Sequence, residues 1–124
     1  MGCKYSENLL IMHELTVIEN IMNISLQVAT QNKMSVITAV NLDVGEMQHL
    51  NEDIMQHGFK ASVKDTIMTD AELKLRWLNV KLKCRDCYYD FEPENGCYHC
   101  PRCASKNTEV KQGMELTINS IEGE

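Results

Sequence analysis

A long amphipathic segment stands out in the pattern of hydrophobic and polar positions. From Glu14 to Gln31 the chain contains neither Gly nor Pro, and apolar residues recur every three or four positions. That spacing is typical of an α-helix with one apolar face. The polar strip is narrow and consists of Glu19, Asn20, Asn23, Gln27, Thr30 and Gln31. The wide apolar arc predicts that this helix contacts two surfaces, such as a sheet and a neighbouring helix or subunit.

The next segments predict a strand and a second helix. Residues 36–44 alternate between apolar and mixed positions, which is typical of a half-buried strand, and Gly45 follows as its end. Asn51 is placed to cap a helix that ends near Lys64. The residues expected to face inward from it are Ile54, Met55, Phe59 and Val63.

Two further apolar segments predict the remaining strands. One extends from Leu73 to Cys84, with a bulge or bend near Trp77, where the alternation changes phase. The last begins at Met114 and continues to a phase shift at Ile121. The order helix, strand, helix, strand, insert, strand predicts an α+β fold, with a small three-stranded sheet, two helices and a cysteine-containing insert.

Composition narrows the possible partners. The chain has 124 residues, of which 44% are hydrophobic, enough for one modest core. Its net charge of -6 comes from 12 basic and 18 acidic residues, which argues against nucleic acid as the main partner. No segment approaches the roughly 20 apolar residues needed to cross a bilayer, so we expect no membrane span.

Four cysteines form the strongest chemical signal. They stand in two C-x-x-C knuckles, with Cys84 and Cys87 in the first and Cys100 and Cys103 in the second, separated by twelve residues. Two such knuckles brought face to face supply four sulfurs to one tetrahedral ion. Zn²⁺ in a structural site is the expected occupant, whereas iron in the same site would make a rubredoxin-like electron carrier. A closed four-sulfur site leaves no open position for catalysis.

Two nearby residues compete for this assignment. Cys97 forms another C-x-x-C with Cys100, and His99 is a possible ligand. Pro101 stiffens the second knuckle, which favours Cys103 over Cys97 as the fourth ligand. Cys97 and Cys3 are therefore assigned no role. Paired knuckles are a metal pattern typical of a reducing compartment, so we expect a cytoplasmic protein.

A short motif before the first helix indicates a function only in combination with other segments of the chain. Alone, Met12-His13-Glu14 is typical of a solvated helix start. It is followed in order by Val44-Gly45-Glu46, the cysteine knuckles, Gly113-Met114-Glu115-Leu116 and Ser120-Ile121-Glu122. With this order and spacing, the chain from Met12 to about Glu122 resembles the HypA/HybF family of hydrogenase nickel incorporation proteins.

The resemblance implies a metallochaperone that binds Ni²⁺ and delivers it to the large subunit of nickel-iron hydrogenase, usually with the GTPase HypB. In the family, backbone nitrogens at the N-terminus and a histidine imidazole hold the nickel, and these map to His13 and Glu14. Met12 supplies its amine only if it is the first residue. Such nitrogen ligation suits Ni²⁺. In the loop after Gly45-Glu46, we assign no nickel-binding role to His49 or to Asn51, Glu52 and Asp53.

The same resemblance divides the chain. Residues 1–11 form an N-terminal extension, which we expect to be a start-site error or an addition, with native translation beginning at Met12. Residues 12–82 and 112–124 form the nickel-binding α+β domain. Residues 83–111 form the zinc-ribbon domain.

The sequence is also compatible with other functions. The sequence contains no Ser-His-Asp or Cys-His arrangement, phosphate-binding Gly-rich loop or H-E-x-x-H helix, so we expect no enzyme activity. The alternatives are a zinc-ribbon adaptor or nucleic-acid-binding module, and a rubredoxin-like iron protein. The wide apolar arc of the first helix also makes a homodimer possible.

Overall fold

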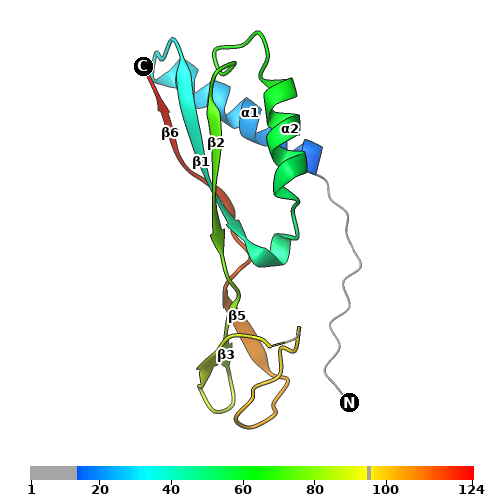
Figure 1. Cartoon of the computed structure of the whole chain (residues 1–124). Helices are drawn as coiled ribbons and strands as arrows, with labels where there is room; N and C mark the ends of the chain where they lie inside the picture. The colour runs from blue at the N-terminus through cyan, green and yellow to red at the C-terminus, as the bar shows by residue number, and fades with distance from the viewer. Residues whose placement is uncertain (1–13, 95) are drawn as a thin grey trace.

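The computed structural model describes residues 14–94 and 96–124. Two helices and a three-stranded sheet form a larger body, and a second sheet forms a smaller lobe at one end (Figure 1). In chain order the elements are α1 (Glu14–Gln31), β1 (Ile37–Gly45), the 3-10 helix η1 (Glu46–Gln48), α2 (Glu52–Ser62), β2 (Glu72–Leu78), β3 (Lys81–Cys84), β4 (Asp90–Phe91), β5 (Thr108–Gln112) and β6 (Leu116–Gly123).

The body is built around β1. Its sheet has the order β2-β1-β6, in which β2 is parallel to β1 and β6 is antiparallel to it. Helix α2 makes the crossover between the two parallel strands. The smaller lobe has the order β4-β3-β5, with both pairs antiparallel. These elements confirm the predicted α+β class, with two helices and a three-stranded sheet.

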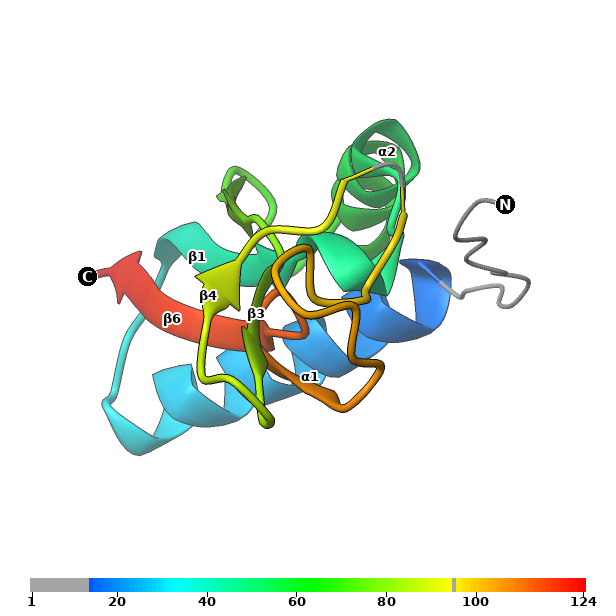
Figure 2. The ribbon, with the colours of Figure 1, turned by 90° about the horizontal axis from the view of Figure 1, so that it is seen from below.

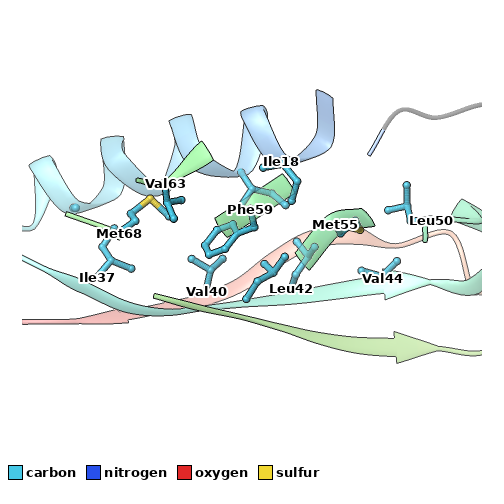
Figure 3. Close-up of a cluster of buried hydrophobic side chains, with 13 residues drawn as sticks. Ile18, Ile37, Val40, Leu42, Val44, Leu50, Met55, Phe59, Val63 and Met68 are labelled. Carbon is cyan, nitrogen blue, oxygen red and sulfur yellow. The ribbon is translucent and has the colours of Figure 1, made fainter. Parts of the chain in front are cut away.

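The core lies between the two helices and the sheet. Phe59 and Met55 of α2 point toward β1, where they meet Val40 and Leu42 (Figure 3). Ile18 of α1 lies beside Phe59 in the same cluster. Burying these side chains supplies the main free energy that holds the helices on the sheet.

Both helices form where the sequence predicts them. Helix α1 has the predicted bounds. The Oδ1 atom of Asn51 accepts a hydrogen bond from the backbone N–H of Ile54 at 2.9 Å, which confirms Asn51 as the cap of α2. Met55, Phe59 and Val63 are buried as expected, but the prediction for Ile54 is wrong because its side chain is 48% exposed. Ile54 lies in the first turn of α2.

The predicted strand from Leu73 to Cys84 is wrong as a single element. It is two strands, β2 and β3, that belong to different sheets and are interrupted at Asn79 and Val80. The side-chain amide of Gln112 donates to the backbone oxygen of Asn79 at 3.0 Å and to its Oδ1 at 2.9 Å. The phase change near Trp77 therefore signals a change of pairing partner, from β1 to β5.

The last strand also differs at its start. Met114 is 60% exposed and precedes β6, so the prediction that the strand begins there is wrong. The predicted phase shift is present: the pairing of β1 with β6 changes register between Asn41 and Leu42, because Asn41 pairs with Ser120 whereas Leu42 pairs with Ile118. This β-bulge lets Ile121 pack against the core. Within the described residues, no helix is both long and apolar enough to span a membrane.

One buried polar group in the body has no partner. Ser25 lies in the middle of α1 with 0% of its surface exposed, and among the described residues its Oγ atom finds no hydrogen-bond partner. An unsatisfied buried hydroxyl destabilises a fold by about 1–3 kcal/mol.

We therefore expect Ser25→Ala to increase the free energy of unfolding by about 1 kcal/mol, because it removes the unsatisfied hydroxyl and introduces a better helix former. Denaturant unfolding followed by helical circular dichroism measures this change. Ser62→Ala, at the exposed end of α2, is the matched control and should change stability by less than about 0.5 kcal/mol. A clear loss of stability in Ser25→Ala would contradict the interpretation.

Candidate metal centre

Four cysteine sulfurs converge in the smaller lobe. Cys84 ends β3 and Cys87 follows in the next turn, whereas Cys100 and Cys103 lie in the loop before β5. The four Sγ atoms all lie within 4.8 Å of one another. Cys84 Sγ is 3.6 Å from Cys103 Sγ, and Cys87 Sγ is 3.6 Å from Cys100 Sγ. This arrangement can hold one metal ion through four sulfurs.

The two knuckles have the same backbone geometry. In each, the residue after the second cysteine donates its N–H to the carbonyl of the first: Tyr88 to Cys84 at 2.9 Å, and Ala104 to Cys100 at 2.8 Å. Tyr88 and Ala104 both have φ of +63°. This left-handed conformation closes each turn so that both thiols point to the same side, but it is strained for any residue other than Gly.

Hydrogen bonds and burial shift the pKa values of the thiols in different directions. The backbone N–H of Cys87, 3.4 Å from Cys84 Sγ, lowers the pKa of Cys84 to about 7. Burial raises the pKa of Cys87. The backbone N–H of Ser105 acts to lower the pKa of Cys103, but burial and the other three thiols outweigh it and raise that pKa to about 12. Four adjacent thiolates repel one another, so their joint ionisation requires a cation.

Polar contacts hold the knuckles face to face. The carboxylate of Asp86, in the first knuckle, accepts hydrogen bonds from the hydroxyl of Ser105 and from the side-chain amide of Asn107, both beyond the second knuckle. These two donors lower the pKa of Asp86. The backbone adds Arg85 N–H to Asn107 O at 2.9 Å. The sequence pattern predicted the knuckles but not this cross-link, because no spacing rule links Asp86 to residues 19 and 21 positions later.

The competing ligands lie outside the four-sulfur cluster. Neither Cys97 nor His99 belongs to it. The backbone of Cys97 forms a β-bridge with that of Glu94. Cys84 and Cys100 are buried, Cys87 is half-buried and Cys103 is exposed. The four sulfurs therefore surround one point, and solvent reaches this point from the side of Cys103.

The second predicted metal region lies at the start of α1. Met12 and His13 fall outside the described residues, and Glu14 is the first residue described. The Oε2 atom of Glu14 accepts a hydrogen bond from the backbone N–H of Asn51 at 2.9 Å, so the starts of α1 and α2 are joined. The carboxylate of Glu52 accepts from the indole N–H of Trp77 at 3.2 Å. No local sequence pattern predicts either contact, because both join residues far apart in the chain.

The loop that reaches Glu14 also contacts the base of the smaller lobe. The backbone N–H of Met47 donates to Gly113 O at 2.9 Å, and the side-chain amide of Gln48 donates to Met114 O at 2.7 Å. Gly45 N–H donates to Glu115 O at 2.7 Å. Two segments of the resemblance, Gly45-Glu46 and Gly113-Met114-Glu115, are therefore in direct contact.

Known sequences are similar along nearly the whole chain. A family model described as hydrogenase/urease nickel incorporation, metallochaperone, HypA, matches residues 12–123. The hydrogenase maturation factor HypA of Dehalococcoides mccartyi is 32% identical over 111 residues, which cover 90% of this chain and 93% of that protein. The HypA of Aquifex aeolicus is 26% identical over 111 residues, covering 90% of this chain and 96% of that protein.

Solved structures agree with the sequence matches. The solution structure of the Ni metallochaperone HypA from Helicobacter pylori superposes with a TM-score of 0.66 at 28% identity, covering 90% of this chain and 97% of that one. A second solution structure, of a HypA protein, gives a TM-score of 0.70 at 27% identity, covering 93% and 98%. The family model alone spans most of the chain, and so the chain belongs to the HypA family of hydrogenase/urease nickel incorporation metallochaperones.

Proposed function

We propose that this protein binds Ni²⁺ through Met12, His13 and Glu14 and delivers it to the large subunit of nickel-iron hydrogenase during maturation. It carries the ion without catalytic turnover. The observation that carries this proposal is the match to the nickel incorporation family over residues 12–123, which begins at the Met-His-Glu motif. A HypB-type GTPase is the expected partner, in the cytoplasm, and a homodimer of the chain remains a further expectation.

The surroundings of Glu14 support a particular role for it. Its carboxylate is held by the backbone N–H of Asn51 at 2.9 Å. A carboxylate used in this way is less available to a metal, whereas the backbone nitrogen of Glu14 is not consumed by that contact. We therefore assign Glu14 a backbone nitrogen ligand and His13 an imidazole ligand, a nitrogen-rich set that suits Ni²⁺. Met12 contributes its amine in a chain that begins there.

The four cysteines Cys84, Cys87, Cys100 and Cys103 are proposed to hold structural Zn²⁺. Tetrahedral zinc with Zn–S bonds of about 2.3 Å needs sulfurs about 3.8 Å apart. The closest sulfur pairs are separated by 3.6 Å and all four lie within 4.8 Å, so the set fits this ion with small adjustments. Zinc also supplies the charge that the four thiols need in order to ionise together.

The proposed zinc-binding and nickel-binding domains correspond to the two sheets. The sheet of the smaller lobe extends from Lys81 in β3 to Gln112 in β5, which supports a zinc-ribbon domain over residues 83–111. The nickel-binding domain then comprises residues 12–82 and 112–124. The proposed extension, residues 1–11, lies outside the described residues.

For nickel, we expect a chain that begins at Met12 to bind about one Ni²⁺ with micromolar-range affinity. His13→Ala should weaken binding at least about tenfold, because it removes the imidazole ligand. A chain that begins at Met1 should bind more weakly than one that begins at Met12, because its nitrogen at Met12 is an amide. Isothermal titration calorimetry of both chains, each with and without His13→Ala, measures these differences.

The matched control for nickel is His57→Ala. His57 is exposed on α2, and its ring Nδ1 lies 2.8 Å from the backbone oxygen of Asp53. This variant should bind nickel as its parent does. Equal nickel binding by His13→Ala and its parent would reject the assignment of His13.

For zinc, Cys84→Ser and Cys103→Ser should each release the ion and unfold the smaller lobe while most of the helical signal is kept. The helices belong to the separate core of the body, so they do not depend on the sulfur ligands. Elemental analysis and circular dichroism measure the two effects. Cys97→Ser, outside the cluster, is the control and should keep its zinc. Stoichiometric zinc in both ligand variants would instead point to Cys97 or His99.

The strained turn after the second knuckle gives a gain-of-affinity test. Ala104→Gly relieves the left-handed backbone at φ of +63° and should raise the apparent zinc affinity by about threefold to fivefold. Competition with a chromogenic chelator measures this change. Ala61→Gly, exposed in α2, should lower the stability of the body by about 1 kcal/mol and leave zinc affinity unchanged. Weaker zinc binding in Ala104→Gly would contradict the role given to this turn.

A further inference from the structure

The two edge strands of the body, β2 and β6, differ in how well they are protected against pairing with strands of other chains. Exposed sheet edges pair readily with other strands unless Lys, Pro or other devices block them. Strand β2 carries Lys74 and Arg76, and the Arg76 guanidinium is paired with Asp43 at 2.9 Å. Strand β6 contains no Lys, Arg or Pro. Among the described strands it has a neighbour, β1, on one side only, as Figure 1 shows.

An apolar groove follows this open edge. Helix α1 and strand β6 run side by side in the same general direction (Figures 1 and 2), and a groove of about 460 Å³ lies between them. Ile21 of α1 is buried at its floor. Ile24 of α1 is 48% exposed on its wall, and Leu116 and Ile118 of β6 are half-buried on the other side.

The charges on α1 and β6 have one sign. Helix α1 and strand β6 contain no Lys or Arg. Their charged residues, together with those that flank β6, are Glu14, Glu19, Glu115, Glu122 and Glu124. The described residues that line the groove are all uncharged. The surface therefore combines an apolar centre with an open strand edge, and the glutamates of α1, of β6 and of the residues that flank β6 supply an acidic surround.

We propose that this groove is a docking site for an extended segment of a partner protein, with alternating apolar residues and with Lys or Arg at its ends. The segment adds to β6 as a further strand, so that main-chain hydrogen bonds supply affinity. Its apolar side chains fill the space between Ile24 and Ile118, and its basic ends meet the acidic surround. This surface goes beyond the proposed zinc site and the described part of the proposed nickel site, since neither Glu14 nor any of the four cysteines is among the described residues that line it.

The same charges disfavour the central antiparallel pairing with a second copy of this chain. An antiparallel pairing of two β6 strands centred between Ile118 and Asn119 places Glu115 of one copy near Glu122 of the other. Like charges opposite one another destabilise strand pairing. No cation on α1 or β6 offsets this repulsion. A basic partner segment removes it instead.

A designed peptide tests the proposal on the full chain. The probe is a capped, fluorescently labelled nine-residue peptide in which Val alternates with Thr and Lys stands at both ends. We expect saturable binding by fluorescence anisotropy, with amide chemical-shift changes concentrated in α1 and β6. Glu in place of each Lys should weaken binding at least about fivefold. N-methylation of alternate peptide nitrogens, which removes donors to the β6 edge, should weaken it at least about tenfold.

Two matched variants of the protein locate the binding. Ile24 and Ile54 are each 48% exposed on a helix, but only Ile24 lines the groove. Ile24→Lys should weaken peptide binding at least about tenfold, whereas Ile54→Lys should keep it within about twofold. Equal effects of the two variants, no saturable binding by the parent protein, or shifts concentrated on β2 would overturn the proposal. Concentration-dependent self-association that Ile24→Lys abolishes would overturn it in favour of a second copy.

Discussion

The arrangement of the two lobes depends on the close approach of two backbones at Gly45 and Gly113. A Cβ atom added to Gly45 would lie 2.0 Å from the carbonyl oxygen of Gly113, so any side chain there would push β1 and the start of the last strand apart. Gly113 itself has φ of +122°, which side chains disfavour, and a Cβ there would lie 2.9 Å from Val80. Both glycines are needed for one crossing, through which the chain returns from the smaller lobe to the body.

This crossing connects the two proposed metal regions through short polar contacts. The carbonyl of Gly113 accepts from Met47 N–H, and the loop that contains Met47 leads to Asn51, whose N–H holds Glu14. Segments that are far apart in the sequence thereby contact one another at the end of the body next to the smaller lobe. This explains why short motifs that are individually weak carry a specific resemblance in combination: several of them meet at a single place.

Sequence patterns predicted the features that depend on neighbouring residues, namely the bounds of a helix, a helix cap and the metal-binding knuckles. The absence of Gly and Pro and the helical spacing of apolar residues gave the bounds of α1, a single side chain gave the cap at Asn51, and the two C-x-x-C spacings named the four sulfurs that converge. Contacts between distant segments were missed. The residues from Leu73 to Cys84 were predicted as one strand, because a local phase change near Trp77 fits a bulge as well as a change of pairing partner from β1 to β5. The contact between Glu14 and Asn51 was missed for the same reason.

The smaller lobe has too little apolar burial to position that crossing by itself. Its described buried apolar residues are Val80, Leu82, Cys84 and Cys100, and the last two are sulfur donors. The body instead buries a larger apolar cluster that includes Phe59 and Ile18. A segment of this size needs a metal or disulfides to remain folded. An ion among the four sulfurs would therefore stabilise more than its own ligands. By keeping β3 and β5 paired, it would also hold Gln112 against Asn79 and Gly113 against Gly45, and with them the loop that reaches Glu14.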